Sequence, residues 1–226
     1  MKHITKISFI YIFLILTVTA YGQTQDEIIN NIQNKYKGIN DFYATFRQDA
    51  TIKALDKVQT ANGELWIKKD AKMRWNYINP GQDQIVSDGT NLWYYYKDEN
   101  YVVKANLKEM GSNPNLISLL SDLDNFKKVF NIKVSTTLEE NKPYYLIDLT
   151  PLDSQDDDIN KISLAIEKDS LLIHKLFLYD PYNNLTIVKL NNIKVNKGIK
   201  DKIFEFKIPK GVEVVTPPPI STNQSS

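Results

Sequence analysis

The first regular pattern in the chain is an apolar stripe at helical spacing. Within residues 24–36, isoleucines and a tyrosine recur at three- and four-residue intervals, which is typical of an amphipathic helix. Thr24 and Glu27 have the spacing of a capping box, and Gly38 ends the pattern. We therefore expect a helix that lies with one face on an apolar surface.

Short runs of alternating apolar and polar residues fill most of the remaining chain. Such alternation predicts β-strands with one buried face, because successive side chains point to opposite sides. The expected strands are residues 42–52, 63–69, 73–77, 84–86, 92–96, 101–107, 132–136, 144–149, 162–167, 173–179, 185–195 and 204–208.

The stretch 92–96 departs from simple alternation because both of its faces are apolar. Leu92 and Tyr94 lie on one face, and Trp93 and Tyr95 lie on the other. A second apolar surface must therefore lie against this strand. The alternation alone does not decide which face is turned to the interior of the fold.

A second helix is expected in the middle of the chain. After a loop at 111–114, residues 116–123 form a short and strongly apolar helical pattern. About ten or eleven antiparallel strands with two helices fit a mainly β fold, a single curved sheet or unclosed barrel. The two helices are the expected cover for its concave face.

The first 22 residues have the pattern of a signal peptide. Lys2 and Lys6 precede an apolar run at 7–18, and Ala20 and Gly22 provide a cleavage site, so Gln23 would begin the mature chain. The alternative is a permanent anchor helix, but the run is short for a bilayer span of about 20 residues. We expect a single domain over 23–216 and a disordered, proline-rich tail over 217–226.

Cysteine is absent from the chain. Bacterial lipoproteins carry their acyl groups on a cysteine that directly follows the signal peptide, so an exported protein without one is not anchored in this way. Disulfides are excluded too, so the fold depends on its hydrophobic core. The expected location is the periplasm, in soluble form.

Charge and motifs argue for binding without catalysis. The formal net charge of +1 gives no broad basic field, so we expect no nucleic-acid partner. Apart from His3 in the expected signal peptide, His174 is the single histidine, and a lone strand histidine is more often a packing or surface residue than a ligand. The acidic run 153–158 lacks the glycine and terminal glutamate of an EF-hand loop. We expect no catalytic residues, no metal and no cofactor.

Residues 63–98 contain the motifs "GELW", "RW", "IVSDG" and "LWYY", in that order. This series resembles the signature of the LolA family of periplasmic outer-membrane lipoprotein carriers. Further similarity extends over nearly all of the expected mature chain, in "DFYATFRQ" at 41–48, "PNL" at 114–116 and "FEFKIPKGVEVV" at 204–215.

The resemblance implies an open barrel whose apolar concave face takes up acyl chains. The implied cargo is acylated lipoproteins that an inner-membrane ABC transporter releases and an outer-membrane acceptor receives, with the carrier acting as a monomer. The residues expected to line the acyl-chain cavity are Phe46, Leu65, Ile67, Met73, Trp75, Tyr77, Trp93 and Tyr95. The residues expected to form the lid helix are Leu116, Ile117, Leu119 and Leu120.

One family feature differs in this chain. Family members have an arginine, followed by proline, that bonds lid-helix carbonyls, whereas this chain has Lys69 and Asp70 there. Lysine keeps the charge but loses the planar fork of donors. Lys69 is the candidate for holding the lid, with Arg47 and Arg74 as substitutes, and a solvated lysine is the alternative.

Other functions with the same patterning remain open at this point. An open barrel could bind another lipid or act as a sensor of an acylated envelope ligand. A hydrolase acting on envelope polymers would need converging polar residues on the concave face, and a secreted structural β-protein would not need lid helices.

Overall fold

The computed structural model describes residues 23–107, 126–139, 142–152, 159–182 and 184–216. This part of the chain forms one sheet of twelve strands in the order β12-β6-β5-β4-β3-β2-β1-β11-β10-β9-β8-β7. The strands are β1 (Asp41–Ile52), β2 (Lys57–Lys68), β3 (Lys72–Asn79), β4 (Gln84–Asp88), β5 (Asn91–Tyr96), β6 (Tyr101–Asn106), β7 (Phe130–Glu139), β8 (Lys142–Pro151), β9 (Lys161–Glu167), β10 (Ile173–Tyr179), β11 (Leu185–Val195) and β12 (Glu213–Val215).

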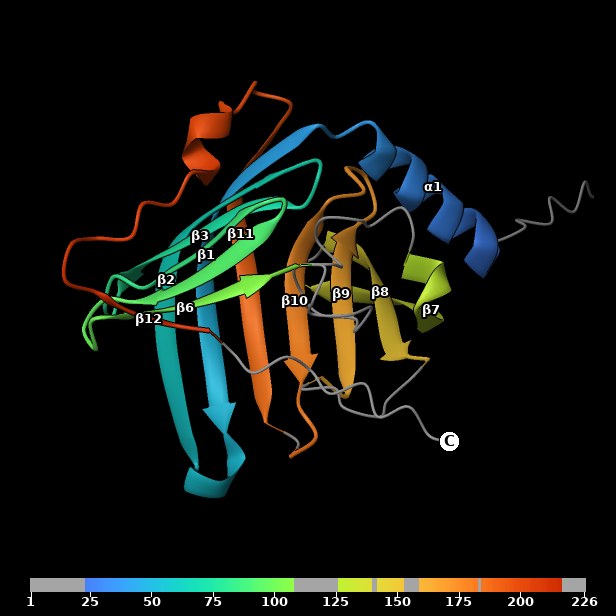
Figure 1. Cartoon of the computed structure of the whole chain (residues 1–226). Helices are drawn as coiled ribbons and strands as arrows, with labels where there is room; N and C mark the ends of the chain where they lie inside the picture. The colour runs from blue at the N-terminus through green and yellow to red at the C-terminus, as the bar shows by residue number, and fades with distance from the viewer. Residues whose placement is uncertain (1–22, 108–125, 140–141, 153–158, 183, 217–226) are drawn as a thin grey trace, which may run out of the picture.

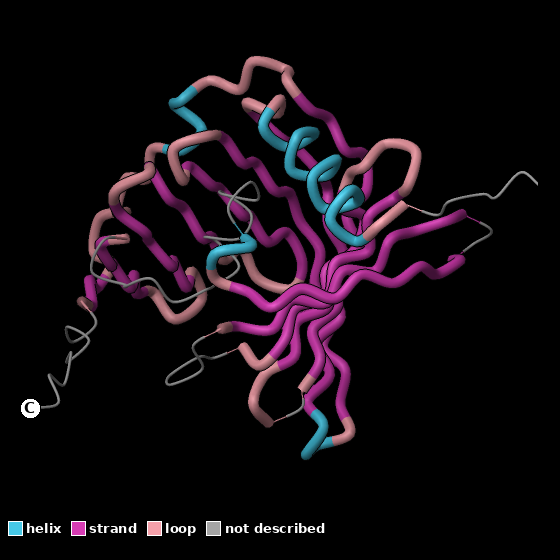
Figure 2. Tube along the Cα trace, turned by 90° about the vertical axis from the view of Figure 1, so that its right-hand side faces the viewer, coloured by secondary structure: helices cyan, strands magenta, loops and turns pink. Residues whose placement is uncertain are grey.

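The sheet bends strongly and does not close (Figures 1 and 2). β12 and β7 remain at its two edges, so the architecture is the expected unclosed barrel with an inner and an outer face. Neighbouring strands are antiparallel except β12, which pairs with β6 in parallel. β12 was not among the strands expected from the sequence, and the predicted strands that pair with one another do so in antiparallel fashion.

The helix α1 (Gln25–Lys37) forms where the sequence predicts it. The Thr24 hydroxyl accepts the Glu27 backbone N–H at 3.3 Å, and the Glu27 carboxylate accepts the Thr24 N–H at 2.8 Å, which completes the capping box. The three buried residues of α1, Ile28, Ile29 and Ile32, pack with the inner face of the sheet. The amphipathic helix is thus the cover of one part of this face (Figure 1).

Polar contacts place α1 across the strands at the β7 edge. The Gln25 side chain donates to the Ile132 carbonyl oxygen at 3.1 Å and accepts the Val134 N–H at 3.0 Å, both on β7. At the other end of the helix, the Tyr36 hydroxyl accepts the Ile173 N–H of β10 at 2.9 Å, and burial raises the pKa of Tyr36. The helix therefore reaches from β7 to β10 and satisfies backbone groups at the sheet margin.

The hydrophobic core lies on the inner face. Alternate residues of the strands share one cluster with α1, as period-two geometry requires. Its buried strand members are Phe42, Ala44, Phe46, Leu65, Ile67, Met73, Trp75, Leu92, Phe130, Ile147, Leu149, Ile162, Leu164, Ile166, Ile173, Leu176, Val188 and Leu190.

The strand predicted at 204–208 was wrong. Asp201–Phe204 is instead a 3₁₀ helix, η3. In the segment that follows it, only β12 pairs as a strand. The Arg74 side chain donates to the carbonyl oxygens of Ile203 and Glu205, at 3.1 and 3.5 Å. These backbone groups are therefore bonded by a side chain and not by the backbone of a neighbouring strand. The expected signal peptide, mid-chain helix and tail lie outside the described residues.

Candidate functional site

Three aromatic side chains from β1 and β3 gather on the inner face, across the intervening strand β2. The Phe46 ring lies 4.7 Å from the Trp75 ring and 5.3 Å from the Tyr77 ring, the latter edge to face. The Trp75 and Tyr77 ring centroids are 6.4 Å apart. Aromatic pairs in this range add packing energy beyond the burial of their area.

Gly63 of β2 makes this cluster possible. It lies between Phe46 and Tyr77 in the strand register. A Cβ atom at this position would come within 1.9 Å of the Asn76 carbonyl oxygen and 2.8 Å of the Phe46 ring. Only glycine therefore fits beneath the aromatic cluster, which explains the first residue of the "GELW" motif.

Aliphatic side chains extend the same surface along the strands. Leu65 pairs with Trp75 across β2 and β3, and Ile67 pairs with Met73. All four are buried in the inner core cluster. The structure thus brings together six of the side chains expected to line a cavity: Phe46, Leu65, Ile67, Met73, Trp75 and Tyr77.

The inner face continues into β4 and β5 through residues that were not predicted as site residues. Ile85 lies opposite Trp75, and Tyr94 lies opposite Ile85 in the register. Both are half-buried against the inner cluster, and Leu92 is buried in it. The sequence held a signal for these two residues. Once Trp75 is placed on the inner face, the register of the hairpins places Ile85 and Tyr94 on that face too.

Trp93 and Tyr95 do not belong with the other expected cavity residues. They lie on the outer face, with Val86 and Val102, and both rings are 5.8 Å from the Phe206 ring. Because successive residues alternate, an inner Leu92 and Tyr94 require an outer Trp93 and Tyr95. The choice of Trp93 and Tyr95 as lining residues is therefore corrected, and Phe206 explains why this strand is apolar on both sides.

Polar groups near the aromatic cluster are few and mostly paired. The Tyr77 hydroxyl donates to the Gln48 side-chain oxygen at 3.0 Å. Burial raises the pKa of Tyr77 to about 12, so this hydroxyl stays protonated at neutral pH. The Trp75 indole nitrogen is buried and has no hydrogen-bond partner among the residues that the structure describes.

The "SDG" motif builds a turn. The Asp88 carboxylate accepts the backbone N–H groups of Thr90 at 2.8 Å and Asn91 at 2.7 Å. The Ser87 hydroxyl donates to the Ala71 carbonyl oxygen at 2.6 Å, which joins this turn to the β2–β3 turn. Gly89 has a φ of +95°, which favours glycine. The most specific part of the family signature therefore holds the β3–β5 strands in place.

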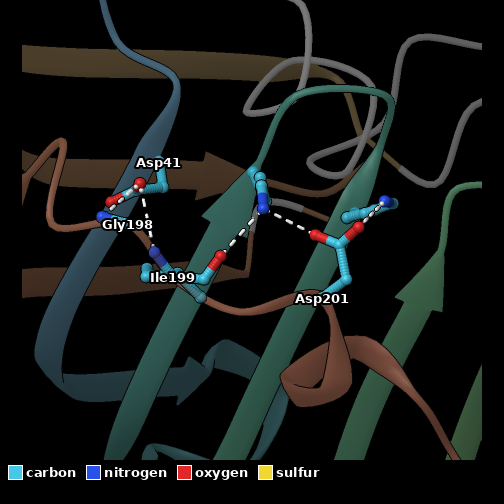
Figure 3. Close-up of polar contacts among 6 residues, drawn as sticks. Asp41, Gly198, Ile199 and Asp201 are labelled. Carbon is cyan, nitrogen blue, oxygen red and sulfur yellow. Dashed lines mark hydrogen bonds and ion pairs between the residues drawn. The ribbon is translucent and has the colours of Figure 1, made fainter.

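A buried carboxylate ties the C-terminal segment to β1 (Figure 3). Asp41 is 4% exposed, and its carboxylate accepts the N–H groups of Lys197, Gly198 and Ile199 at 2.7, 2.9 and 3.2 Å. The segment 197–215 then continues over the outer face to β12. We call this segment the outer strap.

Cationic side chains hold the outer strap farther along. Asp201 pairs with Lys68 at 2.6 Å and Lys72 at 2.9 Å, and the two lysine hydrogen bonds lower the pKa of Asp201 to about 2 (Figure 3). Arg74 donates to the strap carbonyls of Ile203 and Glu205, and burial lowers its pKa. Arg74 therefore acts on the outer face.

Lys69 contacts a helix carbonyl, but in the N-terminal helix. Its ammonium group donates to the Lys37 carbonyl oxygen, at the end of α1, at 3.1 Å. Of the two substitutes, Arg74 acts on the outer face and Arg47 pairs with Asp49 at 3.1 Å on the surface. The expected lid residues Leu116, Ile117, Leu119 and Leu120 lie outside the described residues, so a bond from Lys69 to that helix stays a prediction.

The acidic and histidine side chains of the described residues do not gather into a metal site. No group of three or more His, Asp and Glu side chains there could hold a metal ion. His174 Nε2 lies 3.6 Å from the Glu167 carboxylate, and its ring packs beside the Tyr144 ring, with a centroid distance of 6.0 Å. Among the described helices, none combines the length and apolar character needed to cross a bilayer.

The sequence matches one family model over most of its length. The model, described as outer membrane lipoprotein carrier protein LolA, matches residues 37–207. A protein of Legionella pneumophila (strain Corby) named outer-membrane lipoprotein carrier protein is 29% identical over 92% of this chain and 97% of its own length. A protein of the same name from Methylobacillus flagellatus is 28% identical over 83% of this chain and 88% of its own.

A solved structure shows the same fold at low sequence identity. An uncharacterized conserved protein from Thermus thermophilus superposes with a TM-score of 0.56 at 13% identity, over 86% of this chain and all of the other. The half-open sheet is therefore a fold that strongly diverged sequences can adopt.

Proposed function

Because the chain belongs to the LolA family of outer membrane lipoprotein carrier proteins, we propose that it carries lipoproteins by shielding their acyl chains from water. The cargo would lie against the inner face, and the protein part of the lipoprotein would remain outside. The proposed place of action is the periplasm, between an inner-membrane ABC transporter that releases cargo and an outer-membrane acceptor. The proposed acting form is a monomer.

The continuous apolar inner face is the observation that carries this proposal. It runs from Leu92 on β5, through the aromatic cluster, to Ile147 on β8, and α1 covers part of it. Each methylene group kept from water contributes about 0.8 kcal/mol, so a long acyl chain gains on the order of ten kcal/mol.

The contacts on this face also suit release. Side chains such as Met73 and Phe46 attract an acyl chain by non-directional packing, so no single strong bond has to break when cargo leaves. The cover is held by three isoleucines and a few hydrogen bonds at its ends, including Tyr36 with Ile173. Cargo entry would exchange contacts with the cover for contacts with acyl chains.

Transfer from membranes tests the proposal directly. The purified chain beginning at Gln23 is incubated with spheroplasts that make an acylated lipoprotein, and the soluble fraction is analysed for a complex of the two. We expect soluble lipoprotein well above the amount obtained with an unrelated periplasmic protein. A lipoprotein whose acylated cysteine is replaced by serine serves as the control and should not be bound.

Two results would contradict carriage. Release at the level of the unrelated protein would show that the inner face does not take acyl chains from a membrane. Equal binding of the acylated and the non-acylated lipoprotein would show that the protein part is recognised instead.

A further inference from the structure

The indole N–H of Trp75 is a buried hydrogen-bond donor without an acceptor in the described part of the chain. Trp75 is 3% exposed and lies in the middle of the inner face, on β3. Leaving a buried donor unsatisfied costs about 1–3 kcal/mol, and nearly all buried polar groups in proteins have a partner. This donor therefore needs an explanation.

The side chains next to Trp75 are apolar or already paired. Its cross-strand neighbours on β2 and β4 are Leu65 and Ile85, which have apolar side chains. Phe46 packs against its ring, and the nearby Tyr77 hydroxyl already donates to Gln48. Among the residues that the structure describes, the environment is thus apolar with a single unused donor.

The position distinguishes Trp75 from the other two tryptophans. Trp93 lies on the outer face against Phe206. Trp66 pairs with Arg74 in the register, which places it on the outer face too, where its ring is 5.5 Å from that of Tyr43. Within the described residues, only the tryptophan on the proposed acyl-binding face has its indole N–H buried and unpaired.

We propose that the Trp75 indole N–H donates a hydrogen bond to a carbonyl oxygen of the bound acyl chain, at its ester linkage. This inference rests on the proposed function and specifies it: the inner face would recognise acyl groups and not hydrocarbon chains as such. An ester carbonyl is a neutral acceptor, so it can enter an apolar site without the desolvation cost of a carboxylate. A donor-only group in an apolar wall is complementary to such a ligand.

Paired probes separate the carbonyl from the hydrocarbon chain. One probe is a lipopeptide with a diacylglyceryl group, and the other is its dialkyl ether counterpart, which has chains of equal length but no ester carbonyls. The chain has three tryptophans, so indole ¹⁵N labelling gives three N–H signals, and Trp75→Phe identifies the one that belongs to Trp75. We expect the ester probe to move the Trp75 signal downfield, and the ether probe to move it much less.

Affinity measurements give the second test. Trp75→Phe keeps a ring and removes the donor, so it should weaken binding of the ester probe by about three- to tenfold and leave the ether probe nearly unchanged. Trp66→Phe, the matched change on the outer face, should affect neither probe. A thermal melt of each variant checks that it is folded.

The outcomes distinguish this inference from the proposed function. An equal loss of affinity for both probes in Trp75→Phe would show that the ring acts by packing alone, and would overturn carbonyl recognition. The same conclusion would follow if wild-type protein bound both probes equally and the Trp75 signal did not move, while carriage itself would stand. Failure of the wild-type protein to bind either probe would contradict the proposed function.

Discussion

The two faces of β5 show how differently the protein closes its inner and outer surfaces. On the outer face, Trp93 and Tyr95 are covered by Phe206, from the protein's own C-terminal segment. On the inner face, Leu92 and Tyr94 join a much larger cluster whose cover includes α1. The outer side of β5 therefore faces a small cluster that the chain's own residues cover. Its inner side faces a wide cluster that a ligand could share.

The bonds that hold each cover differ in kind. The outer strap is fixed by directional contacts along its length, from the Asp41 carboxylate to Lys68 and Arg74. Contacts of α1 with the sheet are mainly apolar, with polar bonds concentrated at its ends. Directional bonds specify one arrangement, whereas apolar contacts can be exchanged for contacts with acyl chains at little net cost. The comparison suggests a permanent outer closure and an exchangeable inner one.

Ile85→Glu should give the largest effect, because it places a charge on the proposed acyl-binding face. Ile85 is half-buried, so the carboxylate can reach water when the site is empty and the fold should persist. Bound acyl chains would remove that water, and we expect cargo binding to fall by about 100-fold or more. The spheroplast assay measures the loss.

The matched control for Ile85→Glu lies on the outer strap. Ile208 is 42% exposed there, so Ile208→Glu introduces the same charge away from the inner face. It should leave cargo binding near the wild-type level. If both variants bind cargo like the wild type, the inner face is not the binding surface, and the functional difference between the faces disappears.

Asp41→Ala should have the next largest effect, on stability and not on cargo. Removal of the carboxylate leaves three partly buried backbone N–H groups without their acceptor, and we expect the free energy of unfolding to fall by about 2–3 kcal/mol. Urea denaturation measures this change, and hydrogen exchange at residues 197–199 should increase. Asp49→Ala is the control and should cost about 1 kcal/mol or less, because the Asp49 contacts, the ion pair with Arg47 and the hydrogen bond from Thr60, lie at the surface.

Asp41→Ala also tests whether the two closures are independent. Correctly folded variant should still take up lipoprotein, because the outer strap and the proposed acyl site lie on opposite faces of the sheet. A loss of cargo binding in variant protein that is still folded would show that the outer strap and the inner face are coupled, contrary to the comparison.

The sequence predicted the sheet well wherever period-two alternation and a turn motif agreed. The predicted ends of β10 and β11 are the same as those in the structure, and the Thr24 capping box located the start of α1. The strand at 204–208 was wrong because its alternation, with Phe204 and Phe206, reflects packing on the outer face and not a place in the ladder. Alternation reports burial, and burial does not require a strand partner.

The sequence predicted which types of residue form the candidate site, but it predicted only in part which face of the sheet each residue occupies. Phe46, Trp75 and Tyr77 were found together, since their strands have one apolar side each. In β5, where both sides are apolar, the sequence offered no basis for choosing between Tyr94 and Tyr95. That choice depends on the pairing with β4 and on Phe206, which lies far away along the chain.

The smallest effect concerns the pH dependence of the outer strap. Hydrogen bonds from Lys68 and then Lys72 lower the pKa of Asp201 from its ordinary value of 3.8 to about 2. Because the folded-state pKa lies below the unfolded one, the ion pairs stabilise the fold fully above about pH 4, and this stabilisation is lost as the pH falls toward 2. Asp201→Asn should therefore unfold more easily than the wild type at neutral pH, by a small margin that vanishes near pH 2. Thermal melts of both proteins across this range measure the margin, and added salt should reduce it because Asp201 is exposed. A margin that persisted at pH 2 would show that Asp201 acts through neutral hydrogen bonds and not through charge, and the ion pairs would then not explain how the outer strap is held.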